Sequence, residues 1–153
     1  MNKILALVLL LTMSLFSQMS SAQETPTVEH YTTSPTALFS SAVRVGHMLY
    51  LSGQIGRDPA TSKLAEGGVE AETHQIMKNI KATLVKYGSS MEEVVKCTVF
   101  MADPNDREVF NRAYRSYFND KPPARSGVGN LVLALNATAE VECMATVGLK
   151  KAN

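Results

Sequence analysis

Residues 92–118 read EEVVKCTVFMADPNDREVFNRAYRSYF, and this stretch predicts a buried strand that runs directly into an amphipathic helix. The apolar run over residues 94–101 suits a strand that is covered on both sides. Pro104 is tolerated in the first turn of the helix, and either Asp103 or Asn105 can cap it. The aromatic residues at helical spacing form the predicted core-facing stripe: Phe110, Tyr114, Tyr117 and Phe118. A strand joined to such a helix indicates helices packed on a sheet.

Another helix, the first in chain order, is predicted upstream, where Ile76, Ile80 and Leu84 recur every four residues. Met77 and Val85 lie beside this stripe, and the pattern ends at Gly88. Lysines fall mostly toward the opposite side, so the helix covers a core with one face.

Strands are predicted on both sides of these helices. Residues 39–56 read as two strands around a turn at Gly46 and His47, and residues 130–149 read as strand-rich. The predicted order is therefore β-β-α-β-α-β-β. This order indicates an α+β domain of two layers, with one mixed sheet and two helices.

The N-terminal residues 1–22 are predicted to be a secretory signal peptide. MNK is followed by a long apolar run, and Ser20 and Ala22 occupy positions −3 and −1 of a cleavage site before Gln23. The alternative is a retained anchor, for which the run is short. We expect an exported protein, periplasmic or secreted, with a flexible leader at 23–37, a single domain at 38–153 and no membrane association after cleavage.

Composition argues against several kinds of partner. The formal net charge is +1, without the clustered basic face that nucleic-acid binding usually requires. The three histidines lie far apart and lack companions at ligand spacing, so no metal site is expected. Cys97 and Cys143 could pair in an oxidising compartment or remain buried thiols, and the sequence does not choose between these states.

A single arginine, Arg125, lies within residues 121–130, KPPARSGVGN. Two prolines precede it and favour an extended segment. A guanidinium on a stiff segment presents a planar fork of donors to a carboxylate and loses little freedom on binding. The alternative is a structural ion pair with Glu140 or Asp120.

The sequence resembles the reactive intermediate (enamine/imine) deaminase family, called Rid, from about Phe39 to Leu149. Five segments carry the resemblance: VRVGHMLYLSGQIG, THQIMKNIKATLVKYG, EEVVKCTVFMADPNDREVFNRAYRSYF, PPARSGVGNL and AEVECMA. The resemblance implies a chorismate-mutase-like fold with both helices on one face of the sheet. It also implies a homotrimer with sites between subunits. The implied reaction is hydrolysis of enamines and 2-imino acids, as by 2-iminobutanoate/2-iminopropanoate deaminases, to 2-oxo acids and ammonia without cofactor or metal.

The same resemblance assigns roles to individual residues. Arg125 matches the arginine that binds the substrate carboxylate, and Glu140 matches the strand acid. The loop serine and glycine fall on Ser52 and Gly53, and the asparagine of the second helix falls on Asn111. Two further substrate-binding positions depart from the family: Phe39 stands where tyrosine is common, and Gly127 stands where cysteine is common.

These residues suggest a mechanism in which Arg125 orients the substrate and Glu140 moves protons for water and the leaving amine. Alternation places Glu142 on the same strand face as Glu140, so only the resemblance selects between them. Ser52 could contact the substrate or close a turn before Gly53. Because the departures remove polar groups, the alternative function is a non-catalytic trimer that binds small carboxylates outside the cytoplasm.

Overall fold

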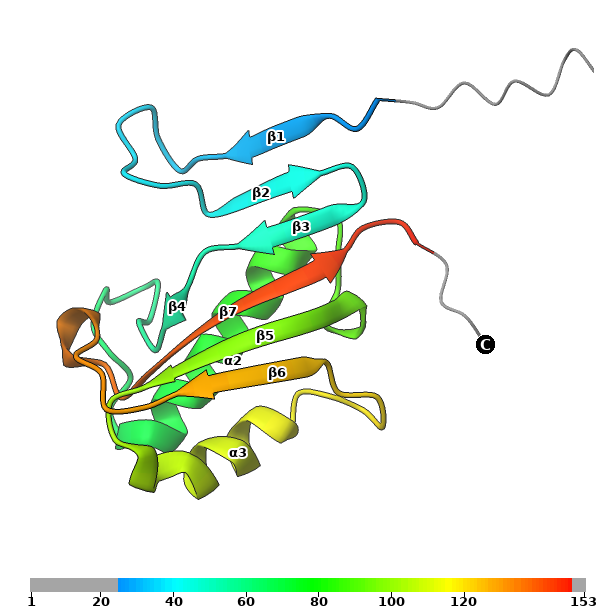
Figure 1. The fold of residues 1–153 in the computed structure, drawn as a ribbon. Helices are drawn as coiled ribbons and strands as arrows, with labels where there is room; N and C mark the ends of the chain where they lie inside the picture. Colours follow the sequence, from blue (N-terminus) through cyan, green and yellow to red (C-terminus); the bar gives the residue numbers. More distant parts are fainter. Residues whose placement is uncertain (1–24, 150–153) are drawn as a thin grey trace, which may run out of the picture.

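The computed structural model describes residues 25–149, which form one twisted sheet with two helices packed against it (Figure 1). The strands of this described part are Val28–Tyr31 (β1), Ala42–Val45 (β2), Met48–Leu51 (β3), Gln54–Ile55 (β4), Val94–Met101 (β5), Ala124–Val128 (β6) and Ala139–Thr146 (β7). The helices are Gly68–Lys86 (α2) and Arg107–Arg115 (α3). The predicted signal peptide lies outside the described residues.

The sheet is mixed, as predicted. Its strand order is β1-β2-β3-β7-β5-β6, and β4 pairs with β7 beside this path. All neighbouring pairs are antiparallel except β5 and β6, which run parallel because α3 carries the chain from one to the other. The crossover makes β6 an edge strand directly beside α3, and β6 is the strand that carries Arg125.

Both helices pack on the same face of the sheet, which confirms the two-layer α+β prediction. Alternate residues of β5 and β7 are buried, and they join side chains of α2 and α3 in a single apolar cluster. The helical members are Ile76, Met77, Ile80, Leu84, Phe110 and Tyr114, and Phe118 joins them from the segment that follows α3. Val85, expected beside the stripe of α2, is instead 62% exposed because it lies one position beyond the buried face.

One glycine allows α2 to lie directly against the end of the sheet. A Cβ placed on Gly56 would be 2.6 Å from Cβ of Glu72, so no larger residue fits there. Glu72 is buried, and its Oε2 accepts a hydrogen bond of 2.9 Å from the backbone N–H of Thr138. The contact joins α2 to the loop that leads into β7.

Three short 3₁₀ turns complete the described part: Met91–Glu93 (η1), Pro104–Asp106 (η2) and Ala134–Asn136 (η3). Asp103 caps η2, since its Oδ1 accepts a 2.8 Å hydrogen bond from the backbone N–H of Asn105. This turn supplies the start of the predicted second helix, and α3 follows it at Arg107.

Two predicted boundaries are wrong. The leader expected over residues 23–37 contains β1, which pairs in register with β2 at the edge of the sheet. The strand-rich segment expected from residue 130 begins as a loop with η3, and β7 starts only at Ala139. Both errors reflect backbone pairing between strands, of β1 with β2 and of β7 with β5, which local apolar patterns do not report.

Cys97 and Cys143 form a disulfide bond that links β5 to β7. The two residues are opposite each other in the antiparallel register, with their Cα atoms 4.1 Å apart. Both side chains are buried against the helices, at 0% and 2% exposure. The sequence left the state of these cysteines open, and the pairing of two distant strands decides it.

None of the helices within residues 25–149 combines the length and the apolar character that a membrane crossing requires.

Candidate functional site

Arg125 reaches from the edge strand β6 toward α3. It lies opposite Cys97 in the parallel register, so its side chain is on the face that the helices cover. Its Cζ is 4.9 Å from the ring centroid of Tyr114 and 5.9 Å from that of Phe110. The aromatic stripe of α3 therefore has a second role beside packing, because the faces of the two rings attract the guanidinium.

The structural ion pair considered for Arg125 is absent. Within residues 25–149, the side chain of Arg125 has ring contacts and no carboxylate partner. Glu140, one of the two acids that could have paired with it, lies on the opposite face of the sheet. The guanidinium is exposed and keeps its donors available for a ligand.

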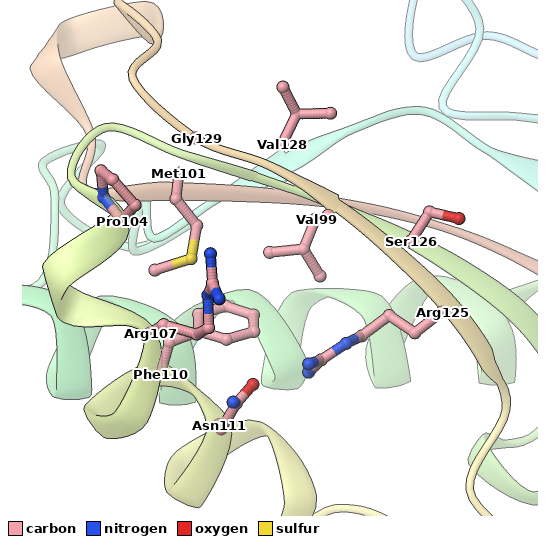
Figure 2. A pocket seen from close by; sticks show the side chains of 11 residues that line it. Val99, Met101, Pro104, Arg107, Phe110, Asn111, Arg125, Ser126, Val128 and Gly129 are labelled. Atoms are coloured by element: carbon pink, nitrogen blue, oxygen red, sulfur yellow. The ribbon is translucent and has the colours of Figure 1, made fainter.

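A cavity of about 320 Å³ lies between β6, the end of β5 and α3. Figure 2 shows the side chains of Arg125, Arg107 and Asn111 extending into this space from β6 and α3. The remaining wall consists of apolar side chains and the glycine-containing backbone of β6: Val99, Met101, Pro104, Phe110, Ser126, Gly127, Val128 and Gly129. Its size suits a small organic molecule.

Asn111 contributes an unsatisfied acceptor to this cavity. Its Oδ1 is buried, and no donor within the described chain reaches it. A buried carbonyl oxygen without a partner is costly, which points to a donor supplied by water, ligand or another chain. The sequence assigned Asn111 and Arg125 to the same substrate, and the structure brings these two side chains to one cavity.

Tyr114 packs its ring against the guanidinium of Arg125 from the side of α3. Its hydroxyl is also buried without a partner in the part of the chain that the structure describes. Burial raises the pKa of Tyr114 to about 12, and the charge of Arg125 opposes this shift. The ring therefore stays neutral beneath the guanidinium at any physiological pH.

Sequence reasoning missed three contributors to this site. Phe110 and Tyr114 were assigned to packing alone, and Arg107 received no role. The missed signal is helical periodicity: positions 107, 110, 111 and 114 share one face of α3. Since Asn111 was already a candidate, its neighbours at helical spacing were candidates as well.

Glu140 and Gly53 form a second group at the other side of the sheet. A Cβ on Gly53 would lie 1.9 Å from Oε1 of Glu140, so the carboxyl group occupies the space that any side chain there would fill. The pairing of β4 with β7 aligns Ile55 with Glu140 and creates this proximity. The absence of a side chain at Gly53 is thus a condition for the position of Glu140.

Ser52 is engaged with the backbone rather than free. Its Oγ donates a 2.7 Å hydrogen bond to the carbonyl oxygen of Ser40. This contact ties two segments together and does not close a turn before Gly53, so it differs from both roles considered for the hydroxyl in the sequence. It also fixes the segment beside Phe39, whose side chain is 67% exposed.

The predicted site residues therefore fall into two groups on opposite faces of the sheet. Arg125, Asn111 and Gly127 line the cavity beside α3. Ser52, Gly53 and Glu140 lie at the β3–β4–β7 end, and Glu140 alternates with the core-facing Ala139 and Val141. One chain does not present Arg125 and Glu140 to the same small molecule.

Glu142 lies on the same face of β7 as Glu140, as alternation predicted. It lines a separate small cavity with Tyr50, Lys96 and Thr98. No cluster of three or more potential metal-ligating side chains occurs among residues 25–149.

Comparisons with known proteins place this fold among characterised relatives. Residues 31–147 match the family described as Endoribonuclease L-PSP. The chain is 38% identical over 119 residues to the 2-iminobutanoate/2-iminopropanoate deaminase of Mus musculus, covering 76% of this chain and 88% of the relative.

Two solved structures share the architecture. RidA from an Antarctic Psychrobacter superposes with a TM-score of 0.70 at 34% identity, covering 74% of this chain and 92% of that one. Yeast Mmf1 superposes with a TM-score of 0.73 at 33% identity, covering 79% and 99%. These matches confirm the chorismate-mutase-like α+β fold predicted from the sequence.

Proposed function

Because the chain belongs to the Endoribonuclease L-PSP family, in which the Rid deaminases fall, we propose that it hydrolyses small 2-imino acids and their enamine tautomers to 2-oxo acids and ammonia. The family resemblance drawn from the sequence is thereby confirmed. Imine deamination is the named activity of relatives that are 38% and 39% identical to this chain.

Arg125 holds the substrate carboxylate in this proposal. The observation that carries it is the guanidinium of Arg125, free of any acid within residues 25–149 and directed into a cavity of suitable size. Two parallel N–H···O bonds fix both position and orientation of a carboxylate. Asn111 adds an acceptor for the N–H of the imine or for water.

Glu140 reaches the substrate only from a neighbouring subunit. Proteins of the Rid family commonly form homotrimers. In the proposed trimer, the face of the sheet that carries Glu140 and Gly53 packs against the β6 edge of the next chain. The division of the site residues between two faces supports this arrangement. One face carries the proposed carboxylate-binding group, Arg125, and the other carries the proposed proton-transfer group, Glu140.

The proposed reaction requires only positioning and proton transfer. Water adds to C2 of the protonated imine, and one water proton passes to the Glu140 carboxylate as the C–O bond forms and the C=N π bond breaks. Glu140 then gives that proton to the amino group of the carbinolamine. The C–N bond breaks, ammonia leaves, and the hydroxyl proton passes to the departing ammonia, which yields the 2-oxo acid and an ammonium ion. Positioning and one proton relay each supply on the order of 10²-fold or more in rate.

A coupled assay tests the proposal. An L-amino-acid oxidase generates the imine in the presence of semicarbazide, which traps it, and an active deaminase lowers semicarbazone formation. We expect the wild-type mature protein to be active and Arg125→Gln to lose at least about 100-fold in kcat/KM, since a charge-assisted pair is removed. Arg112→Gln, an exposed arginine of α3 outside the cavity, is the matched control. Equal activity of Arg125→Gln and wild type would reject the assignment.

The alternative function is binding of small carboxylates without catalysis. Phe39 and Gly127 favour it, because they lack the polar groups common in Rid proteins at these positions. Calorimetric binding of 2-oxobutyrate that depends on Arg125, combined with no acceleration of imine hydrolysis, would establish this alternative.

We propose that the protein is exported. The apolar segment before Gln23 supports this location. The Cys97–Cys143 disulfide also supports it, because disulfides persist in oxidising compartments. The intact mass of the protein recovered outside the cytoplasm tests the proposal: it should begin at Gln23, and a retained Met1 would contradict it.

A further inference from the structure

The cavity that contains Arg125 holds a second guanidinium. Arg107, the first residue of α3, lines the same cavity from the helix side. Figure 2 shows Arg107 rising from α3 beside Met101 and Phe110, while Arg125 crosses from β6. The two charges thus enter one small space from different elements of the fold.

No negative side chain balances these charges within the cavity. Its eleven lining residues include two arginines and no carboxylate. Throughout residues 25–149, Arg107 has no ion pair or side-chain hydrogen bond. It is also exposed, so its position does not arise from packing.

The location of Arg107 is electrostatically unfavourable for the helix itself. The N-terminal end of an α-helix carries partial positive charge, and a cation in the first turn is repelled by it. The acids beside Arg107 in the sequence lie outside the cavity lining: Asp103 caps η2 by accepting from the N–H of Asn105, and neither Asp106 nor Glu108 lines the cavity. Two cations around a cavity whose lining has no acid are stabilised when an anion occupies it.

We propose that Arg107 binds a second carboxylate, so that this protein prefers imines of dicarboxylic amino acids. The inference rests on the proposed function and specifies its substrate class. Arg125 takes the carboxylate next to the imine carbon, and Arg107 takes the one at the far end of the chain. The four- or five-carbon imines derived from aspartate and glutamate carry two such groups on one short chain. The apolar contacts of Val99, Met101 and Phe110 accommodate the methylene groups between them.

The test compares two imines in the semicarbazide assay. Glutamate oxidase acting on glutamate supplies the dicarboxylic imine, and L-amino-acid oxidase acting on methionine supplies a monocarboxylic one. We expect the wild-type protein to show kcat/KM at least about tenfold higher for the dicarboxylic imine than for the monocarboxylic one. One charge-assisted hydrogen bond to the second carboxylate supplies a difference of this size. Arg107→Gln should abolish most of this preference, and Arg107→Lys should retain part of it.

Arg112→Gln is the matched control, because it removes one positive charge from the same helix without touching the cavity. It should leave the preference unchanged. If Arg112→Gln lowers the preference as much as Arg107→Gln, the preference depends on the total positive charge of α3 rather than on Arg107, and the inference fails.

A binding measurement separates failure of this inference from failure of the proposed function. Calorimetry with 2-oxoglutarate and 2-oxobutyrate requires no catalysis. Tighter binding of 2-oxoglutarate by wild type, lost in Arg107→Gln, supports the second carboxylate site even if neither imine is hydrolysed. Hydrolysis of both imines with a preference unaffected by Arg107→Gln overturns the inference and leaves the deaminase proposal intact.

Discussion

The guanidinium of Arg125 lies over the ring of Tyr114, with Cζ 4.9 Å from the ring centroid. Arg125 belongs to an edge strand whose residues are all exposed, whereas Tyr114 is only 4% exposed in the helix beneath it. A rigid ring therefore positions a long and otherwise mobile side chain. The core of the domain thus extends to the guanidinium that we propose binds the substrate carboxylate.

Removal of this ring should weaken binding of the carboxylate. Tyr114→Leu keeps an apolar side chain but loses the cation–π contact, and we expect KM for the imine to rise about fivefold, in line with the energy of such contacts. Tyr114→Phe keeps the ring and is the control, with KM close to wild type. Steady-state kinetics on both variants, after thermal denaturation has verified folding, decides the matter. An equal KM in Tyr114→Leu and Tyr114→Phe would show that the ring does not position Arg125.

The hydroxyl of Tyr114 makes stability depend on pH in the alkaline range. Burial raises its pKa from 10.0 in the unfolded chain to about 12 in the folded protein. The folded state therefore binds more protons between these values, and the free energy of unfolding falls as pH rises from about 10 to about 12. The stabilising contribution is fully present below pH 10.

Chemical denaturation of wild type and Tyr114→Phe across this range provides the measurement. We expect the stability of wild type to fall relative to that of the variant between about pH 10 and pH 12. A constant difference between the two proteins would contradict the raised pKa.

Gly53 should be required for activity, because the carboxyl group of Glu140 occupies the space that a side chain at position 53 would fill. A methyl group on Gly53 would lie 1.9 Å from Oε1 of Glu140 and displace the carboxyl group. We expect Gly53→Ala to lower kcat by about 100-fold, the scale associated with misplacing a reacting group by 1 Å. Steady-state rates in the coupled imine assay provide the measurement.

A double-mutant cycle identifies the cause. Glu140→Ala removes the carboxyl group that the methyl group would meet, so Gly53→Ala should cost little more in that background. Additive losses in the double variant would mean that Gly53 acts independently of Glu140.

The Cys97–Cys143 bond should contribute to stability. It closes a loop between residues 46 positions apart, and such cross-links typically stabilise by about 2–4 kcal/mol. The double variant Cys97→Ala/Cys143→Ala should unfold at lower guanidinium concentration than the oxidised wild type. The companion measurement repeats the denaturation on wild type that was reduced while denatured and then refolded with its thiols kept reduced. This sample should also unfold at a lower guanidinium concentration than the oxidised protein.

Alkylation provides an independent check on the bond. Protein recovered from an oxidising compartment should incorporate alkylating reagent only after reduction. Labelling of both cysteines in the denatured but unreduced protein would contradict the disulfide.

Periodic patterns in the sequence were sufficient for the two helices and the class of fold. Ile76, Ile80 and Leu84 are buried as predicted, because an apolar stripe at helical spacing has one stable arrangement against a sheet. Local patterns were insufficient for β1 and for the start of β7. β1 depends on hydrogen bonds to β2 across the loop between them, and the start of β7 depends on hydrogen bonds to β5, which lies much earlier in the chain.

For the candidate site, the sequence shows which functional groups are present, because each group belongs to a residue type. A guanidinium between two prolines and a glycine, an asparagine on a helix and an acid on a strand are visible as residue types. Spatial arrangement is a different property, since it depends on strand register and on the side of the sheet to which each Cβ points. Folding placed Arg125 and Glu140 on opposite faces, joined Cys97 to Cys143, and brought Arg107 into the cavity of Arg125. These relations arise because sheet pairing and helix packing join segments that no local sequence pattern connects.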